Sequence, residues 1–116
     1  MSSTSGSDYR LMCAAFIDEA LLRPRMYFRD LAALESILHG HAAAFSQLGY
    51  LGAREETFNA SFATWLRAKT GVSAAAGWAH AVTELAEKAD TNAEALFVER
   101  AREFLRDWSD NPPPTR

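Results

Sequence analysis

The sequence predicts an all-α protein, a compact bundle of about five helices in a single domain over residues 8–109. Apolar residues recur at three- and four-residue steps in successive stretches, which is the period of an amphipathic helix. No alternating run of β-branched residues and no Asn-Gly or Asp-Gly hairpin turn competes with that pattern. The length of 116 residues suits one such domain and leaves little room for a second.

The first predicted helix covers residues 8–22 and begins at Ser7 or Asp8, whose side-chain oxygen can accept a backbone N–H at a helix start. Its apolar residues share a helical period and predict one buried stripe: Leu11, Met12, Ala15, Phe16 and Leu22. Pro24 ends this helix, because proline disfavours the α conformation in the residue before it. Residues 23–29 then form a tight connection.

The second predicted helix starts after Asp30 as its cap and ends at Gly49. Its apolar stripe is long: Leu31, Leu34, Leu38, Ala42, Phe45 and Leu48. Gly40 inside it predicts a close approach of another helix.

The third helix ends at Gly71, which can take the left-handed conformation at little cost. Its buried face is aromatic: Phe58, Phe62, Trp65 and Leu66.

The fourth predicted helix begins at Ser73, and its buried face follows: Trp78, Val82, Leu85, Ala86 and Ala89. The fifth has the clearest start, because residues 91–94 (Thr-Asn-Ala-Glu) match a capping box in which Thr and Glu each satisfy a backbone N–H. Its buried face is again aromatic: Phe97, Ala101, Phe104, Leu105 and Trp108. We expect flexible tails at residues 1–7 and 110–116, which are small and polar or rich in proline.

Charge and composition favour some classes of function over others. The formal net charge is -3 at pH 7, which argues against nucleic-acid binding through phosphate neutralisation. Acids and bases balance through Val82, so the negative surplus lies from Thr83 onward. One cysteine allows no disulfide within the chain, and no apolar run approaches the ~20 residues that span a bilayer. We therefore expect a cytoplasmic location and no membrane partner.

The histidines and the cysteine give no sign of a metal site or of catalysis. His39 and His41 project about 200° apart around one helix, so they cannot both bind one metal ion from it. Cys13 lies inside a predicted helix and not at its N-terminus, so no local feature lowers its pKa. We expect no metal, no cofactor and no enzymatic activity.

Two groups of charged residues are candidates for binding a partner protein. The first is the connection around Pro24, whose cations can bind an anion or an acidic partner: Arg23, Arg25 and Arg29, with Tyr27. Its alternative is a structural corner in which these arginines are solvated or pair with Asp18 or Glu19. The second group gathers around the corner before the last helix and can attract a basic partner: Glu84, Glu87, Asp90 and Glu94. The alternative for this second group is that its acids lie on two solvated helix faces and that one of them caps a helix.

The segment Arg23-Pro24-Arg25-Met26-Tyr27 resembles an Arg-Pro-Gly-Met-Tyr motif, with Arg25 at the position of the glycine. The ATPase subunit of type II topoisomerases has this motif, but the chain is too short for that domain and lacks its glycine-rich nucleotide loops. The order of further features is similar to that in small bacterial helical proteins: Gly40-His41, the aromatic segment 58–66, Trp78 and the segment 97–105. Some of those proteins look like immunity partners of bacterial toxins. The resemblance implies a protein that binds a toxin and brings no catalytic residues.

Three hypotheses of function follow from these patterns. The first is a small cytoplasmic protein-binding module that neutralises a partner, such as a toxin, by steric and electrostatic occlusion. The second is a structural or regulatory subunit that self-associates as a homo-oligomer through its aromatic helix faces. The third is a helical bundle that binds a small molecule in its core.

Overall fold

The structure, a computed structural model, describes residues 5–49 and 57–108, apart from the side chains of residues 5–8, 24 and 25. It contains six helices in those ranges: α1 (Ser5–Leu22), α2 (Pro24–Tyr27), α3 (Leu31–Gln47), α4 (Phe58–Thr70), α5 (Trp78–Ala89) and α6 (Ala93–Trp108). The described residues contain no strand. The predicted all-α bundle of about five helices is confirmed, with the one-turn helix α2 inside the predicted connection.

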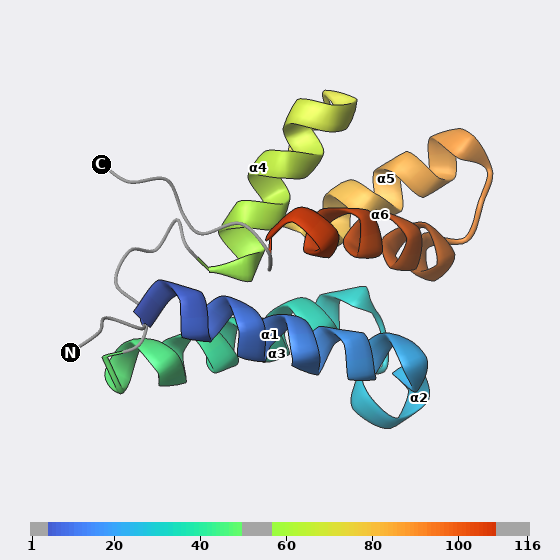
Figure 1. The fold of residues 1–116 in the computed structure, drawn as a ribbon. Coiled ribbons are helices and arrows are strands. Elements are labelled where there is room, and N and C mark those ends of the chain that lie inside the picture. Colours follow the sequence, from blue (N-terminus) through green and yellow to red (C-terminus); the bar gives the residue numbers. More distant parts are fainter. Residues whose placement is uncertain (1–4, 50–56, 109–116) are drawn as a thin grey trace.

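The helices form two layers (Figure 1). Helices α1 and α3 lie side by side in one layer, where Tyr9 packs edge-on against Phe45 and Phe16 stacks on His41. Helices α4, α5 and α6 form the other layer, and α5 and α6 are antiparallel neighbours. No helix among the described residues is both long enough and apolar enough to cross a bilayer.

Aromatic side chains fill the core of the second layer. Trp78 of α5 stacks on Phe97 of α6 with ring centroids 4.7 Å apart, and Phe62 of α4 meets Trp78 edge-on at 5.6 Å. The indole N–H of Trp78 donates to Asn59 Oδ1 at 2.7 Å, so this buried tryptophan keeps a polar partner. The predicted buried face of the last helix is confirmed at every position: Phe97, Ala101, Phe104, Leu105 and Trp108.

The prediction for the buried side of α1 was wrong at four of its five positions, because only Phe16 packs, half-buried, against the core. Leu11, Met12 and Leu22 are 55%, 56% and 68% exposed. A different stripe faces the core: Tyr9, Cys13, Ile17, Ala20 and Leu21. These residues also recur at helical spacing, and apolar residues surround α1 on several sides, so periodicity alone cannot choose between the two stripes.

Several predicted helix ends are confirmed and others are displaced. Asp30 Oδ1 accepts the N–H of Ala33 at 2.8 Å, so Asp30 caps α3 as predicted. Gly71 ends α4 in the left-handed conformation, with φ of 78°. Helix α1 begins at Ser5, three residues before the predicted start, while the predicted tail residues 1–4 and 110–116 lie outside the described residues.

The predicted starts of the last two helices and the role of Gly40 need correction. Ser73 does not cap α5, which begins five residues later at Trp78. Helix α6 is capped by Asn92, whose Oδ1 accepts the N–H of Ala95 at 2.9 Å, so the cap lies one residue after the predicted Thr91. A Cβ at Gly40 would have no atom of another described element within 4 Å, so the predicted close approach of a helix is not found in the described part of the chain.

Candidate functional site

Side chains of the first layer satisfy the backbone groups at helix ends in the second layer. The hydroxyl of Tyr9 accepts the N–H of Phe58 at 2.8 Å, at the start of α4. At the end of α6, Arg10 Nη1 donates to the carbonyl of Trp108 at 3.0 Å, and the Arg10 guanidinium lies 5.3 Å from that indole ring centroid. Helix starts leave N–H groups without partners and helix ends leave carbonyls, so these bonds hold the two layers in register.

Glu35 of α3 makes the equivalent contact at the start of α5. Its carboxylate accepts the N–H of Trp78 at 3.1 Å and that of Ala79 at 3.3 Å. No side chain from the preceding segment caps α5, so Glu35 supplies the cap from 43 residues away. Gly77, which precedes the helix, has a φ of +101°, and a Cβ there would lie 2.6 Å from Glu35 Oε2. Glycine at this position therefore leaves room for the carboxylate.

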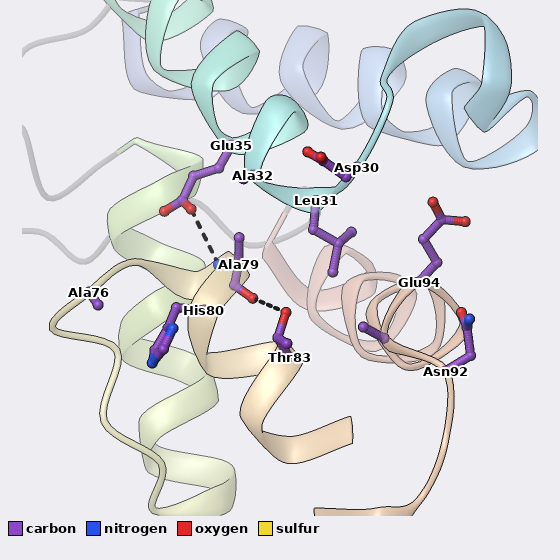
Figure 2. A pocket seen from close by; sticks show the side chains of 11 residues that line it. Asp30, Leu31, Ala32, Glu35, Ala76, Ala79, His80, Thr83, Asn92 and Glu94 are labelled. Atoms are coloured by element: carbon purple, nitrogen blue, oxygen red, sulfur yellow. Dashed lines mark hydrogen bonds between the residues drawn. The ribbon is translucent and has the colours of Figure 1, made fainter. Parts of the chain in front are cut away.

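An open groove of about 570 Å³ lies where α3, α5 and α6 meet (Figure 2). Asp30 and Glu35 come from the start of α3, His80 and Thr83 from α5, and Asn92 and Glu94 from the start of α6. The remaining lining is small and apolar: Leu31, Ala32, Ala76, Ala79 and Ala93. We call this feature the acidic groove, after its three carboxylates Asp30, Glu35 and Glu94.

The balance of charge in the acidic groove favours a cation. Three helix N-termini, those of α3, α5 and α6, border it, and each carries a partial charge of about +0.5. Three carboxylates oppose them, and none of the described residues that line the groove is a lysine or an arginine. The three carboxylate charges exceed the total of about +1.5 at the three helix starts. The helix dipoles therefore reduce the negative potential without reversing it, so an anion is disfavoured there.

The polar groups of the groove differ in whether they already form hydrogen bonds within the protein. Asp30 caps α3, Glu35 caps α5, and the Thr83 hydroxyl donates to the carbonyl of Ala79 at 2.8 Å. Glu94 is half-buried and has no hydrogen bond or ion pair within the described part of the chain. Glu94 is therefore the carboxylate of the groove that an incoming cation can reach without breaking a helix cap.

The structure gives the buried cysteine no catalytic setting. Cys13 is fully buried, and burial raises the pKa of its thiol to about 12, although a hydrogen bond with Tyr9 opposes that rise. The thiolate is the reactive form of cysteine, so Cys13 is unreactive at neutral pH. It does not line the acidic groove. Among residues 5–49 and 57–108, no three His, Cys, Asp or Glu side chains gather as a metal ion would need.

The predicted acidic group is divided by the structure. Of its four members only Glu94 lines the groove, whereas Glu84 and Glu87 are exposed on α5 and Asp90 is exposed at the end of that helix. Asp90 has a left-handed φ of 55° and ends α5. Two residues of the groove, Asp30 and Glu35, were absent from the predicted set. The sequence predicts Asp30 only as a helix cap, and no sequence signal points to Glu35.

The predicted cationic group is also divided. Arg23 Nη1 pairs with Glu19 Oε2 at 3.1 Å, and the Tyr27 hydroxyl donates to the same oxygen at 3.4 Å. This is the structural alternative foreseen for the corner, although an exposed ion pair of this kind contributes only about 0–1 kcal/mol. Arg29 is exposed and has no ion pair with any residue that the structure describes. The side chain of Arg25 lies outside the described atoms.

No protein-family model matches the chain, and comparison with curated proteins and with solved structures finds no match either. The similarity to small bacterial immunity-type proteins therefore stays a prediction.

Proposed function

We propose that this protein is a binding module whose acidic groove receives a positively charged, partly apolar segment of another protein. The observation that carries the proposal is that one open groove combines an apolar floor with three carboxylates, and that no cation is among the described residues of its lining. Lysine and arginine match that combination, because each has an apolar stem and a charged end. The stem would lie on the alanines of the floor while the charge reaches Glu94.

The shape and charge of the groove favour a protein segment over the other ligand classes. The groove is open to solvent, whereas sites for small molecules usually enclose most of the ligand. Its net negative charge would repel the phosphates of a nucleic acid. The alanines of the floor allow a partner's backbone to approach closely. We therefore prefer a protein partner, bound without chemistry, to a small-molecule ligand.

A more specific form of the proposal is neutralisation of a toxin in the cytoplasm. The support for it is the sequence resemblance, together with the charge of the groove. A toxin that acts on nucleic acids needs a basic surface, and a partner with an acidic groove can cover such a surface. Neutralisation would then be steric and electrostatic occlusion.

The test compares partner capture by two charge-reversed variants. Glu94→Lys places a cation in the groove, and Glu84→Lys makes the same change on the exposed surface of α5 outside it. The proposal expects a protein partner from native lysate to be retained by the wild type and by Glu84→Lys, and lost by Glu94→Lys. A partner held equally by both variants would place the binding surface elsewhere. Thermal unfolding of each variant confirms that it is folded.

A further inference from the structure

The chain itself contains a segment with the chemistry that the acidic groove favours. Residues 22–29 include three arginines and no acid, so with the Arg23–Glu19 pair counted they carry a surplus of two positive charges. Leu22 and Met26 are 68% and 75% exposed, and Arg29 is exposed beside them in sequence. We call residues 22–29 the cationic tip. Exposed apolar side chains near an exposed cation such as Arg29 are what the groove is suited to bind.

Helix α2 lies next to the start of α3 (Figure 1), and residues at the start of α3 line the acidic groove. Residues 28–30 join α2 to α3, and Asp30, which directly follows Arg29, lines the groove. Arg29 itself is not among the residues that line the groove, so the tip does not fill the groove of its own chain. In a symmetric dimer a two-fold axis relates the two copies. When the tip and the groove are neighbours on the surface, such an axis pairs the tip of each copy with the groove of the other.

We propose that a second copy of this chain occupies the groove, in a symmetric dimer in which each cationic tip lies in the partner's acidic groove. The inference rests on the proposed function, because it assumes that the groove receives a cationic protein segment. Both contacts form at once, so the dimer leaves no unpaired groove or tip. A foreign partner must then compete with the second copy, and protein concentration controls how many grooves are free.

The test is sedimentation equilibrium of the full chain with two opposite charge reversals. Arg29→Glu makes the tip less positive, and Glu94→Lys makes the groove less negative. Each variant alone should weaken dimerisation at least about tenfold, because residues 29 and 94 then carry charges of the same sign at both contacts. An equal mixture of the two should restore dimers, since every tip then meets a groove of opposite charge. Arg102→Glu, on the exposed surface of α6, is the control and should dimerise as the wild type does.

The outcomes separate this inference from the proposed function. A synthetic peptide of residues 21–30 is titrated into the wild type and into Glu94→Lys. Binding of the peptide to the wild type alone, with the full chain monomeric at millimolar concentration, would disprove the dimer and leave the groove as a binding site. A folded mixture of the two variants that stays monomeric while the wild type dimerises would also overturn the tip-to-groove contact. If neither the peptide nor a second copy binds, the dimer is disproved, and the proposed function then stands only if Glu94→Lys loses a partner from lysate that the wild type retains.

Discussion

At the residue scale, Glu35 performs two tasks with one carboxylate. It caps α5 through the N–H groups of Trp78 and Ala79, and it lines the acidic groove. The N–H groups that it accepts lie at the positive end of α5. Glu94 has no such cap to maintain, so the two carboxylates differ: Glu35 positions the groove and Glu94 is available to a ligand.

Replacing Glu35 by alanine should destabilise the fold. Glu35→Ala leaves two N–H groups at the start of α5 without their acceptor, and loss of a helix cap costs about 0.5–2 kcal/mol. Urea unfolding measures the change. Glu84→Ala is the matched control, because Glu84 is exposed on α5 and does not cap it, and its change should stay within about 0.5 kcal/mol. Equal effects of both substitutions would show that Glu35 does not hold α5.

Cys13 should make the protein sensitive to alkali. Burial raises the pKa of its thiol from 9.0 to about 12, so between these values the unfolded chain loses a proton that the folded chain keeps. The free energy of unfolding therefore falls as pH rises above 9, by about 1.4 kcal/mol per pH unit. Burial also raises the pKa of Tyr9 above its ordinary value of 10.0. Cys13→Ala should therefore move the onset of the fall from about pH 9 to about pH 10. Parallel stability curves for the two proteins would contradict this account.

At the scale of single helices, α6 and α1 show what periodicity can and cannot predict. In α6 the apolar residues lie on one side, so the sequence predicted its whole buried face. In α1 apolar residues lie on several sides, and the buried side is decided by contacts with other helices. Tyr9 reaches the start of α4 and Arg10 reaches the end of α6, contacts that span 49 and 98 residues. Contacts between residues so far apart in the sequence cannot be predicted from the local spacing of apolar residues.

Two truncations test which side of α1 faces the core. Ile17→Ala removes a fully buried side chain and should lower the free energy of unfolding by about 2–5 kcal/mol. Leu11→Ala removes a side chain that is 55% exposed and should cost less than about 1 kcal/mol. Chemical denaturation measures both changes. A larger loss for Leu11→Ala than for Ile17→Ala would instead support the stripe predicted from the sequence, in which Leu11 is buried.

At the scale of the whole molecule, the groove combines parts from three separate helices. The sequence supplied Glu94 as a candidate and Asp30 as a cap, but it could not bring them together with Glu35. The acidic stretch from Glu84 to Glu94 follows the chain around a corner, so neighbours in sequence end on different surfaces. The groove forms where the starts of α3, α5 and α6 meet. The hydrogen bond from the start of α5 to Glu35 joins α5 to α3.

The most direct test of the account is whether the acidic groove selects for positive charge. Two peptides of equal length, one with leucine and arginine and one with leucine and glutamate, are titrated while backbone amide chemical shifts are followed. The account predicts that the arginine peptide shifts the amides of Leu31, His80 and Ala93, which line the groove. It also predicts that Glu94→Lys abolishes these shifts and that the glutamate peptide causes none. Shifts at the groove from the glutamate peptide would contradict the central claim, because the three helix N-termini would then outweigh the carboxylates.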